Sequence, residues 1–514
     1  MTIDPAKRWW VLVTMTGSLS MILIDQTVVS VALPTMQRDL DLTQTGLQWV
    51  INAYLLAIAV FVALGGRIGD LIGNERTFRL GGLIFVLASA ACGLAQSDSW
   101  IIIARSVEGV GAALMTPASG AIVMNAFGPS ERGKAMGVYS GVSMIFLALG
   151  PLIGGVLVEA ISWRAVFFVN LPVGIAMLVL AHTTLPRKVV TGPHPPGRID
   201  WPGVPLLIGG VGALVLGLMQ SRVWGWDSPA IIGLLIAAAV LLPAFAWWEL
   251  RAPEPLVQLR LFKSGNFTAD SIVIAAMQFG LMGVSVFGAI WVQDVLGFGP
   301  ITAGLSLLPL TIPLLLLSVP TGRLYDRIGP RVPVTAGAVL LGLALIWTAV
   351  VLDQLDYAWL VPGYALMGVG LALMITPTTT DALNAADPAL RGQASGVIQT
   401  MRQVGGTVGI AILGTIVANV QHDRVTDWIA ADPTQRAGDA SQIETVLANP
   451  GAAPAAAADP DVITMLKDAV TTAISASYWV AGAVSLLSAI VAVVMLRRVR
   501  AADATADDAP MVVG

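Results

Sequence analysis

The chain of 514 residues is 56% hydrophobic and 12% charged, and its mean hydropathy is +0.79. A soluble domain is about 45–50% apolar and about 25% charged, so this composition excludes a soluble protein and indicates an all-α membrane protein. A net charge of −4 without a dense basic run argues against nucleic acid as a partner. A single cysteine, Cys92, and three scattered histidines exclude a disulfide framework and predict no metal site.

The apolar segments are long enough to cross a bilayer as helices, which takes about 20 residues. The first begins at Trp9, after Lys7 and Arg8. It is too long for the core of a signal peptide and lacks a small-residue cleavage site, so we interpret it as a retained span. Fourteen such segments begin near residues 9, 46, 78, 101, 134, 165, 203, 229, 268, 301, 332, 358, 394 and 473.

The basic residues orient these fourteen predicted spans. Of the 28 lysines and arginines, 20 fall in the two termini and in the connections that follow even-numbered spans, and six fall on the other side. Because basic residues collect on the cytoplasmic side, both termini are expected in the cytoplasm. Residues 421–470 are expected to form a long external loop that is partly disordered and has room for short helical pieces. The tail, residues 501–514, is expected to be a disordered cytoplasmic end.

Two parts of the chain repeat each other. "GVGAALMTP" (109–117) and "GVGLALMITP" (368–377) begin 259 residues apart, and "GRIGDLIG" (66–73) matches "GRLYDRIG" (322–329). A duplicated transporter fold explains this self-similarity.

The repeat also predicts the domain organisation. Six helices with short loops need about 200 residues, so the surplus length in the middle of the chain indicates two inserted spans. The expected order is a six-helix bundle in residues 1–190, two inserted helices in 191–255, a second six-helix bundle in 256–500 and the tail.

Arg105 and Glu108 lie within an otherwise apolar segment. Their counterparts in the repeat are Tyr364 and Met367, so the second half of the chain does without these charges. Residues three apart on a helix can touch. Either the pair only neutralises itself, or it is a proton switch in which protonation of Glu108 releases Arg105 to another partner, such as Asp25 or a backbone carbonyl.

Asp25 lies in the outer half of the first span. Ionisable groups within a membrane are commonly functional, so Asp25 is expected to bind a proton or a cationic substrate. The alternative is a packing hydrogen bond to Thr27 or to a neighbouring span. With Arg105 and Glu108, Asp25 makes up the predicted proton-coupling group.

Asp70 and Asp326 are predicted to lie at the cytoplasmic ends of spans two and ten. Both have basic neighbours, among them Arg76 and Arg327. Such charges can latch two bundles together by pairing with the ends of neighbouring helices. The alternative is that they only orient the chain. We expect these four residues to act in gating.

Further candidates come from the fifth span and from polar residues in other spans. A closely packed, kinked fifth span is predicted by Gly150, Pro151, Gly154 and Gly155, either as a hinge or for packing alone. Asp270 is expected to lie near the cytoplasmic surface and to be solvated. The weaker candidates for lining a cavity are Asn52, Gln278, Gln399, Arg402 and Gln403.

Five segments, in order along the chain, resemble the signatures of one transporter family. They are "IDQTVVSVALP" (24–34), "GGRIGDLIGNER" (65–76), "RSVEGVGAA" (105–113), "LGPLIGG" (149–155) and "WRAVFFVNLPVG" (163–174). Together they resemble the major facilitator superfamily, and specifically its fourteen-span drug:proton antiporters. The resemblance covers residues from about 9 to 496 and implies the major facilitator fold, with two six-helix bundles and two inserted helices.

The resemblance also implies a function. It suggests a proton-coupled secondary active exporter of drugs or other amphipathic compounds that works by alternating access. It places Asp25 at the family's acidic position and the fifth-span glycines in an antiporter hinge. The chain departs from the pattern at Glu108, where the family usually has Gln, and at Phe146, where a glycine is usual. Asn74 and Glu75 replace basic residues. These departures bear on coupling and on substrate range.

Two rival functions stay open. One is a dedicated exporter of a single endogenous metabolite or lipid, and the other is a non-transporting membrane sensor on the same fold. The chain has no ATP-binding loop, so an ion or substrate gradient would supply the energy, and no nucleophile–His–acid pattern indicates an enzyme. We expect no cofactor, a small amphipathic substrate, protons and membrane lipid as partners, a monomer, and the cytoplasmic membrane of a bacterium.

Overall fold

Helices dominate the computed structural model, which describes residues 5–185, 198–431 and 460–497. No strand occurs in those residues. Thirteen of their helices are long and apolar enough to cross a membrane, and a bent fourteenth counts if its two parts form one span. The predicted all-α membrane class is therefore confirmed, and the predicted number of fourteen spans is reached if the bent pair is one span.

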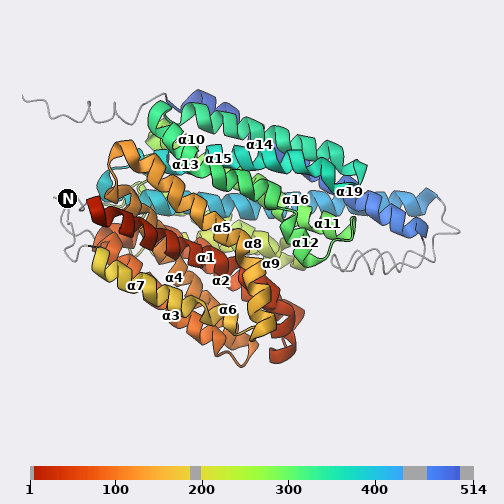
Figure 1. Ribbon diagram of the computed structural model, residues 1–514, viewed down its shortest axis with the longest axis horizontal. Helices are drawn as coiled ribbons and strands as arrows, with labels where there is room; N and C mark the ends of the chain where they lie inside the picture. Colours follow the sequence, from red (N-terminus) through yellow and green to blue (C-terminus); the bar gives the residue numbers. More distant parts are fainter. Residues whose placement is uncertain (1–4, 186–197, 432–459, 498–514) are drawn as a thin grey trace, which may run out of the picture.

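The first set of helices, drawn from red to yellow in Figure 1, packs around α4 and α1. Local signals begin and end these helices: the Thr43 and Ser97 hydroxyls cap α2 and α4, and Gly73, at φ +99°, separates α2 from α3. The first set comprises α1 (Pro5–Leu40), α2 (Gln44–Ile72), α3 (Asn74–Gly93), α4 (Asp98–Ala126), α5 (Arg132–Ala160), α6 (Ala165–Phe168) and α7 (Asn170–Thr184).

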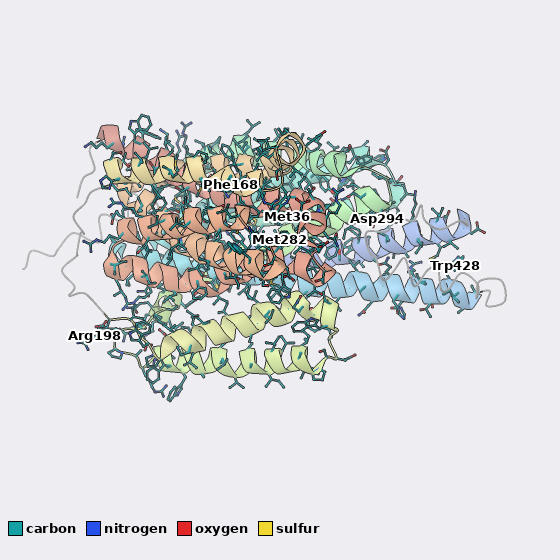
Figure 2. All side chains as sticks on the ribbon, turned by 90° about the horizontal axis from the view of Figure 1, so that it is seen from below. Met36, Phe168, Arg198, Met282, Asp294 and Trp428 are labelled. Atoms are coloured by element: carbon teal, nitrogen blue, oxygen red, sulfur yellow. The ribbon has the colours of Figure 1, made fainter. Side chains whose placement is uncertain are left out.

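Two helices, α8 (Gly203–Trp224) and α9 (Pro229–Glu249), follow the first set and pack against each other. Figure 2 shows this pair along one side of the main bundle. Through α8 the pair contacts α2 and α16 (Arg391–Ala431). The apolar side chains of α9 are largely exposed, as expected of a helix that faces lipid.

The second set of helices follows, from green to blue in Figure 1, and touches the first set mainly through α13 against α5 and α16 against α2. A π-helical turn at Val284–Gly288 separates its first two helices. The second set comprises α10 (Gly265–Gly283), α11 (Ala289–Asp294), α12 (Pro300–Leu305), α13 (Leu308–Ile328), α14 (Arg331–Val351), α15 (Leu360–Asn384), α16 and α19 (Pro460–Met495).

The prediction of a loop over residues 421–470 is wrong at both of its ends. Helix α16 continues to Ala431 and α19 begins at Pro460, and the two extend beyond the rest of the bundle (Figure 2). Val425 and Trp428 pack with Leu466 and its neighbours in a small apolar cluster of their own. Apolar residues at helical spacing outweigh the polar composition there. Residues 432–459 and the predicted tail lie outside the described residues.

The start of α1 and the end of α19 lie at the same end of the bundle, which we call the terminal end (Figure 1). Arg8 pairs with Glu131 at a distance of 2.5 Å, just before α5. The backbone N–H of Arg497 donates to Asn266 at the start of α10. The terminal end therefore collects the starts of α1, α5 and α10.

Candidate functional site

A buried charge cluster, Asp25, Arg105, Glu108 and Asn170, lies within the first set of helices. The Arg105 Nη1 atom is 2.6 Å from Asp25 Oδ2 and 2.8 Å from Glu108 Oε2. The Arg105 side chain is 1% exposed and both carboxylates are fully buried. Asn170 donates from Nδ2 to the other oxygen of Asp25, at 3.0 Å. The guanidinium of Arg105 on α4 thus binds a carboxylate on α1, and the amide of Asn170 on α7 binds the same carboxylate.

The surroundings hold the Arg105 side chain in place. Its Nε atom donates to the backbone carbonyl of Val50 at 3.2 Å, and its guanidinium lies 4.1 Å from the ring centre of Tyr54. An aromatic face attracts a guanidinium. Asn170 also donates to Ser89, which fixes the orientation of its amide. The cation is therefore bound by two carboxylates, a carbonyl and a ring.

The charges in this cluster do not balance. Two ionised carboxylates against one guanidinium leave a net charge of −1 in a buried site, which is costly. Glu108 Oε1 has no hydrogen-bond partner among the described residues, although Cys92 Sγ lies 3.5 Å from Glu108 Oε2. Binding of one proton would make the cluster neutral. The arrangement therefore suits a group that takes up and releases a proton.

The structure brings together the three residues of the predicted proton-coupling group. The expected contact between Arg105 and Glu108 is present, but Asp25 and a backbone carbonyl bind Arg105 at the same time rather than in exchange. Thr27 donates to backbone carbonyls and not to Asp25. Sequence analysis missed Asn170, whose one signal was its place in the segment 163–174.

A first contact between the two sets of helices lies at the terminal end, on Asp70 of α2. Its two carboxylate oxygens accept the backbone N–H groups of Gly392 and Gln393, both at 2.8 Å. These residues begin α16, and the N-terminus of a helix is a natural site for an anion. Asp70 therefore latches α2 of the first set to α16 of the second.

Asp326 makes the equivalent contact in the opposite direction. It lies on α13 and accepts the backbone N–H groups of Gly133 at 2.9 Å and Lys134 at 3.1 Å. These residues begin α5. The two latches thus reciprocate, each set supplying one carboxylate and one helix N-terminus.

Two arginines accompany the latches, and sequence analysis missed their roles. Arg132 donates from Nη1 to Asn384 Oδ1 at 2.7 Å, and Arg391 donates to Asn125 Oδ1. At the 259-residue offset of the internal repeat, Asn125 corresponds to Asn384 and Arg132 to Arg391, but this correspondence does not indicate that each arginine reaches into the other set. Each arginine begins a helix and bonds an asparagine at or next to the end of another.

Arg76 and Arg327 behave differently from the carboxylates with which they were grouped. Both are exposed, and neither forms an ion pair within the described part of the chain. Neither carboxylate needs an arginine as a partner, because backbone N–H groups already bind Asp70 and Asp326. No ion pair in the described residues therefore supports the expectation that these two arginines take part in gating.

The fifth span, α5, is bent. Its segments Pro129–Leu147 and Leu152–Ala160 differ in direction by 44°, with Gly150 and Pro151 between them. A Cβ added to Gly150 would overlap the Thr27 hydroxyl, and one at Gly154 would lie 2.9 Å from the backbone oxygen of Val28. The bend thus lies where α5 crosses α1, close in sequence to Asp25.

Replacing Gly150 with alanine is expected to lower stability by about 1–3 kcal/mol through overpacking against α1, and to impair transport. Thermal unfolding and vesicle transport assays would measure both effects. Gly155→Ala is the matched control, because nothing lies within 4 Å of a Cβ at Gly155. Equal behaviour of the two variants would contradict the close contact.

The weaker cavity candidates are all half-buried and lie on three neighbouring helices, α2, α10 and α16. Arg402 donates weakly to Thr379 at 3.4 Å, and its Nε atom has no partner among the described residues. Gln278 packs against Gly406. The remaining three, Asn52, Gln399 and Gln403, lie on the same helices.

The expectation for Asp270 is wrong. Its side chain is fully buried in the second set and has no hydrogen-bond donor for either oxygen in the described residues. Its position near a helix start suggested contact with solvent, but α15, α16 and α19 pack against α10 and bury it. Only tertiary packing places Asp270 beside Asp381.

Comparisons with known proteins agree with this architecture. The sequence model described as Major Facilitator Superfamily matches residues 15–410. The "Tetracenomycin C resistance and export protein" of Streptomyces glaucescens is 34% identical over 95% of this chain and 91% of its own. The "Multidrug resistance protein Stp" of Mycobacterium tuberculosis is 36% identical over 78% and 74%.

A solved structure shares the fold. The crystal structure of the human organic anion transporter MFSD10 superposes with a TM-score of 0.64, covering 95% of this chain and 100% of the other. The two sequences are 13% identical, so the likeness concerns the fold alone.

Proposed function

Because the chain belongs to the major facilitator superfamily, we propose that it exports small amphipathic compounds across the cytoplasmic membrane of a bacterium in exchange for protons. The terminal end would face the cytoplasm, as the distribution of basic residues predicts. The names of the two reported relatives support an exported drug or antibiotic. The observation that carries the proposal is the buried charge cluster, whose unbalanced charge favours the uptake of one proton.

The proposed cycle uses the two features already described. With the latches of Asp70 and Asp326 made, the terminal end is closed and the cluster is buried, so a proton would have to enter from the opposite end. Protonation of Asp25 or Glu108 would weaken one contact to Arg105 and so change the balance between α1, α4 and α7. Only a difference in proton affinity between two conformations can drive such a change. A movement of α1 would be transmitted to α13 through the bent helix α5, which packs against both.

The test is proton movement in everted membrane vesicles with an acidic interior. We expect tetraphenylphosphonium, neutral antibiotics including tetracenomycin C, or anionic lipids to dissipate the gradient. Asp25→Asn is expected to abolish the response, because it removes a proton-binding carboxylate and keeps its shape. Asp353→Asn, an exposed carboxylate beyond α14, is the control and should respond as the wild type does.

The outcomes separate the rivals. Responses to many compounds support a multidrug exporter, and a response to one compound supports a dedicated exporter. No response in a folded, inserted protein would favour a non-transporting sensor. An unchanged response in Asp25→Asn would overturn the role of the cluster.

A further inference from the structure

A second pair of buried acids lies in the second set of helices, away from the charge cluster. Asp270 on α10 is fully buried, and Asp381 on α15 is 7% exposed. Asn266, one helical turn before Asp270 on the same face of α10, donates to Asp381 at 2.9 Å, so the two carboxyl groups face each other. Neither forms an ion pair within the described residues. Two ionised carboxylates so placed would repel each other strongly, because water is excluded from between them.

The hydrogen bonds around the pair are unequal. Asp381 accepts from Asn266 Nδ2 at 2.9 Å and from the Tyr325 hydroxyl at 3.0 Å. Asp270 accepts from no group in the described chain, although both of its oxygens are buried. Donors stabilise an ionised carboxylate, and a buried oxygen without one favours the protonated acid. Of the two, Asp270 is therefore the member better suited to hold a proton.

Within residues 5–185, 198–431 and 460–497, no neighbouring cation is placed to balance the pair. The polar side chain next in line, Tyr325 on α13, is neutral. Arg402 on α16 reaches Thr379, Arg391 reaches Asn125, and Arg497 contacts Asn266 only through its backbone N–H. The other described basic residues on elements packed against α10 form no ion pair with either aspartate; they are Arg260, Lys263, Arg331, His422, Arg424 and Lys467.

A chain of hydrogen bonds connects the pair to the latches. Tyr325 accepts from Asn384 Nδ2 at 2.8 Å, and Asn384 in turn accepts from Arg132 at the start of α5. The next residues of α5 bind Asp326, which follows Tyr325 directly in the sequence. Separation of α5 from α13 and α15 would break this chain of hydrogen bonds and would open the terminal end to water beside the two aspartates.

We propose that Asp270 and Asp381 form a second proton-binding site, which holds one proton while the terminal end is closed and loses it when that end opens. Two carboxyl groups that share one proton are a known solution for paired acids. Opening admits water, which can solvate both charges. By linkage, a rise in pH must then favour opening as much as opening favours loss of the proton. The site is distinct from the charge cluster and does not depend on which compound is exported.

The first test detects the proton in the protein itself. Infrared spectra of the full-length, lipid-reconstituted protein at neutral pH are expected to show the C=O stretch of a buried carboxylic acid. Asp270→Asn should remove a component of this band, and the exposed Asp353→Asn should leave it intact. If Asp270→Asn does not fold, Asp381→Asn can be measured instead, because it also leaves a single carboxyl group in place of the pair. Identical bands in all variants would overturn the proposal, as would loss of the band on adding sodium at constant pH.

The second test measures the coupling to the latches. Spin labels on cysteines at Ser130 and Ala389, exposed residues just before α5 and α16, report the separation of the two sets. The native Cys92 is buried. In the wild type, raising the pH is expected to increase the open fraction. The double variant Asp270→Asn, Asp381→Asn should show a smaller rise of the open fraction with pH than the wild type. The control variant Asp353→Asn should show the same rise as the wild type. An unchanged response in the double variant would overturn the coupling.

A third variant separates binding of the proton from its effect. Tyr325→Phe keeps both aspartates and breaks the chain of hydrogen bonds to Arg132. The infrared band should remain while the pH response of the label distance weakens. Neither readout requires a transported compound, so failure here and failure of the proposed export function are distinguishable.

Discussion

Replacing Arg105 with methionine is expected to abolish transport and to lower the free energy of unfolding by about 3–5 kcal/mol. The substitution leaves Asp25 and Glu108 buried with no cation, and it removes the contacts to Val50 and Tyr54. Thermal unfolding of the purified protein and proton movement in vesicles measure the two effects.

A triple variant distinguishes lost charge balance from lost function. Combining Arg105→Met with Asp25→Asn and Glu108→Gln removes all three charges, so no uncompensated charge stays buried. Most of the stability should return, because neutral groups of similar shape often replace a buried ion pair without loss. Proton-driven transport should stay absent. A triple variant as unstable as Arg105→Met would contradict the electrostatic account, and restored transport would exclude these carboxyl groups as proton carriers.

The second large effect is expected from the latches. An asparagine offers one acceptor oxygen where Asp70 or Asp326 now offers two to a helix N-terminus. Hydrogen bonds to charged groups contribute about 1.5–3 kcal/mol each. Each substitution should therefore lower the population of the closed terminal end by about 10- to 100-fold, and the double variant should lower it further.

Spin-label distances between Ser130 and Ala389 would measure that population. Asp353→Asn is again the control, since its carboxylate is exposed at the other end of α14. A closed distance that persists in the Asp70→Asn, Asp326→Asn double variant would show that packing alone keeps the terminal end shut. In that case the close packing of glycines between the two sets would be the main force that holds them together. An example is Gly137, where an added Cβ would lie 2.5 Å from the backbone oxygen of Ser318.

The sequence predicted best what local spacing decides. The count of spans follows from apolar length, and the contact of Arg105 with Glu108 follows from their positions one helical turn apart. The kink in α5 follows from a proline next to a glycine in a span, since that pair removes a backbone hydrogen bond and bends the helix.

The sequence predicted least well what depends on contacts between distant segments. Asn170 lies 145 residues from Asp25, and nothing in the spacing of either residue indicates that they meet. The burial of Asp270 depends on which helices cover α10. The arginines at the starts of α5 and α16 were identified as repeated residues, but their partners lie in the opposite set and could not be assigned. Composition misjudged residues 421–431, where a few apolar side chains continue α16.

The reciprocity of the two latches has a consequence for the origin of the protein. Asp70 binds the start of α16 while Asp326 binds the start of α5, and the two arginines cross in the same way. In an isologous interface, residue i meets residue j and j meets i, because a two-fold axis relates identical subunits. Two copies of a single six-helix ancestor would build both latches from one set of residues. Fusion of two such copies would preserve that dimer interface, and the charge cluster, present in the first set alone, would mark a place where the copies have diverged.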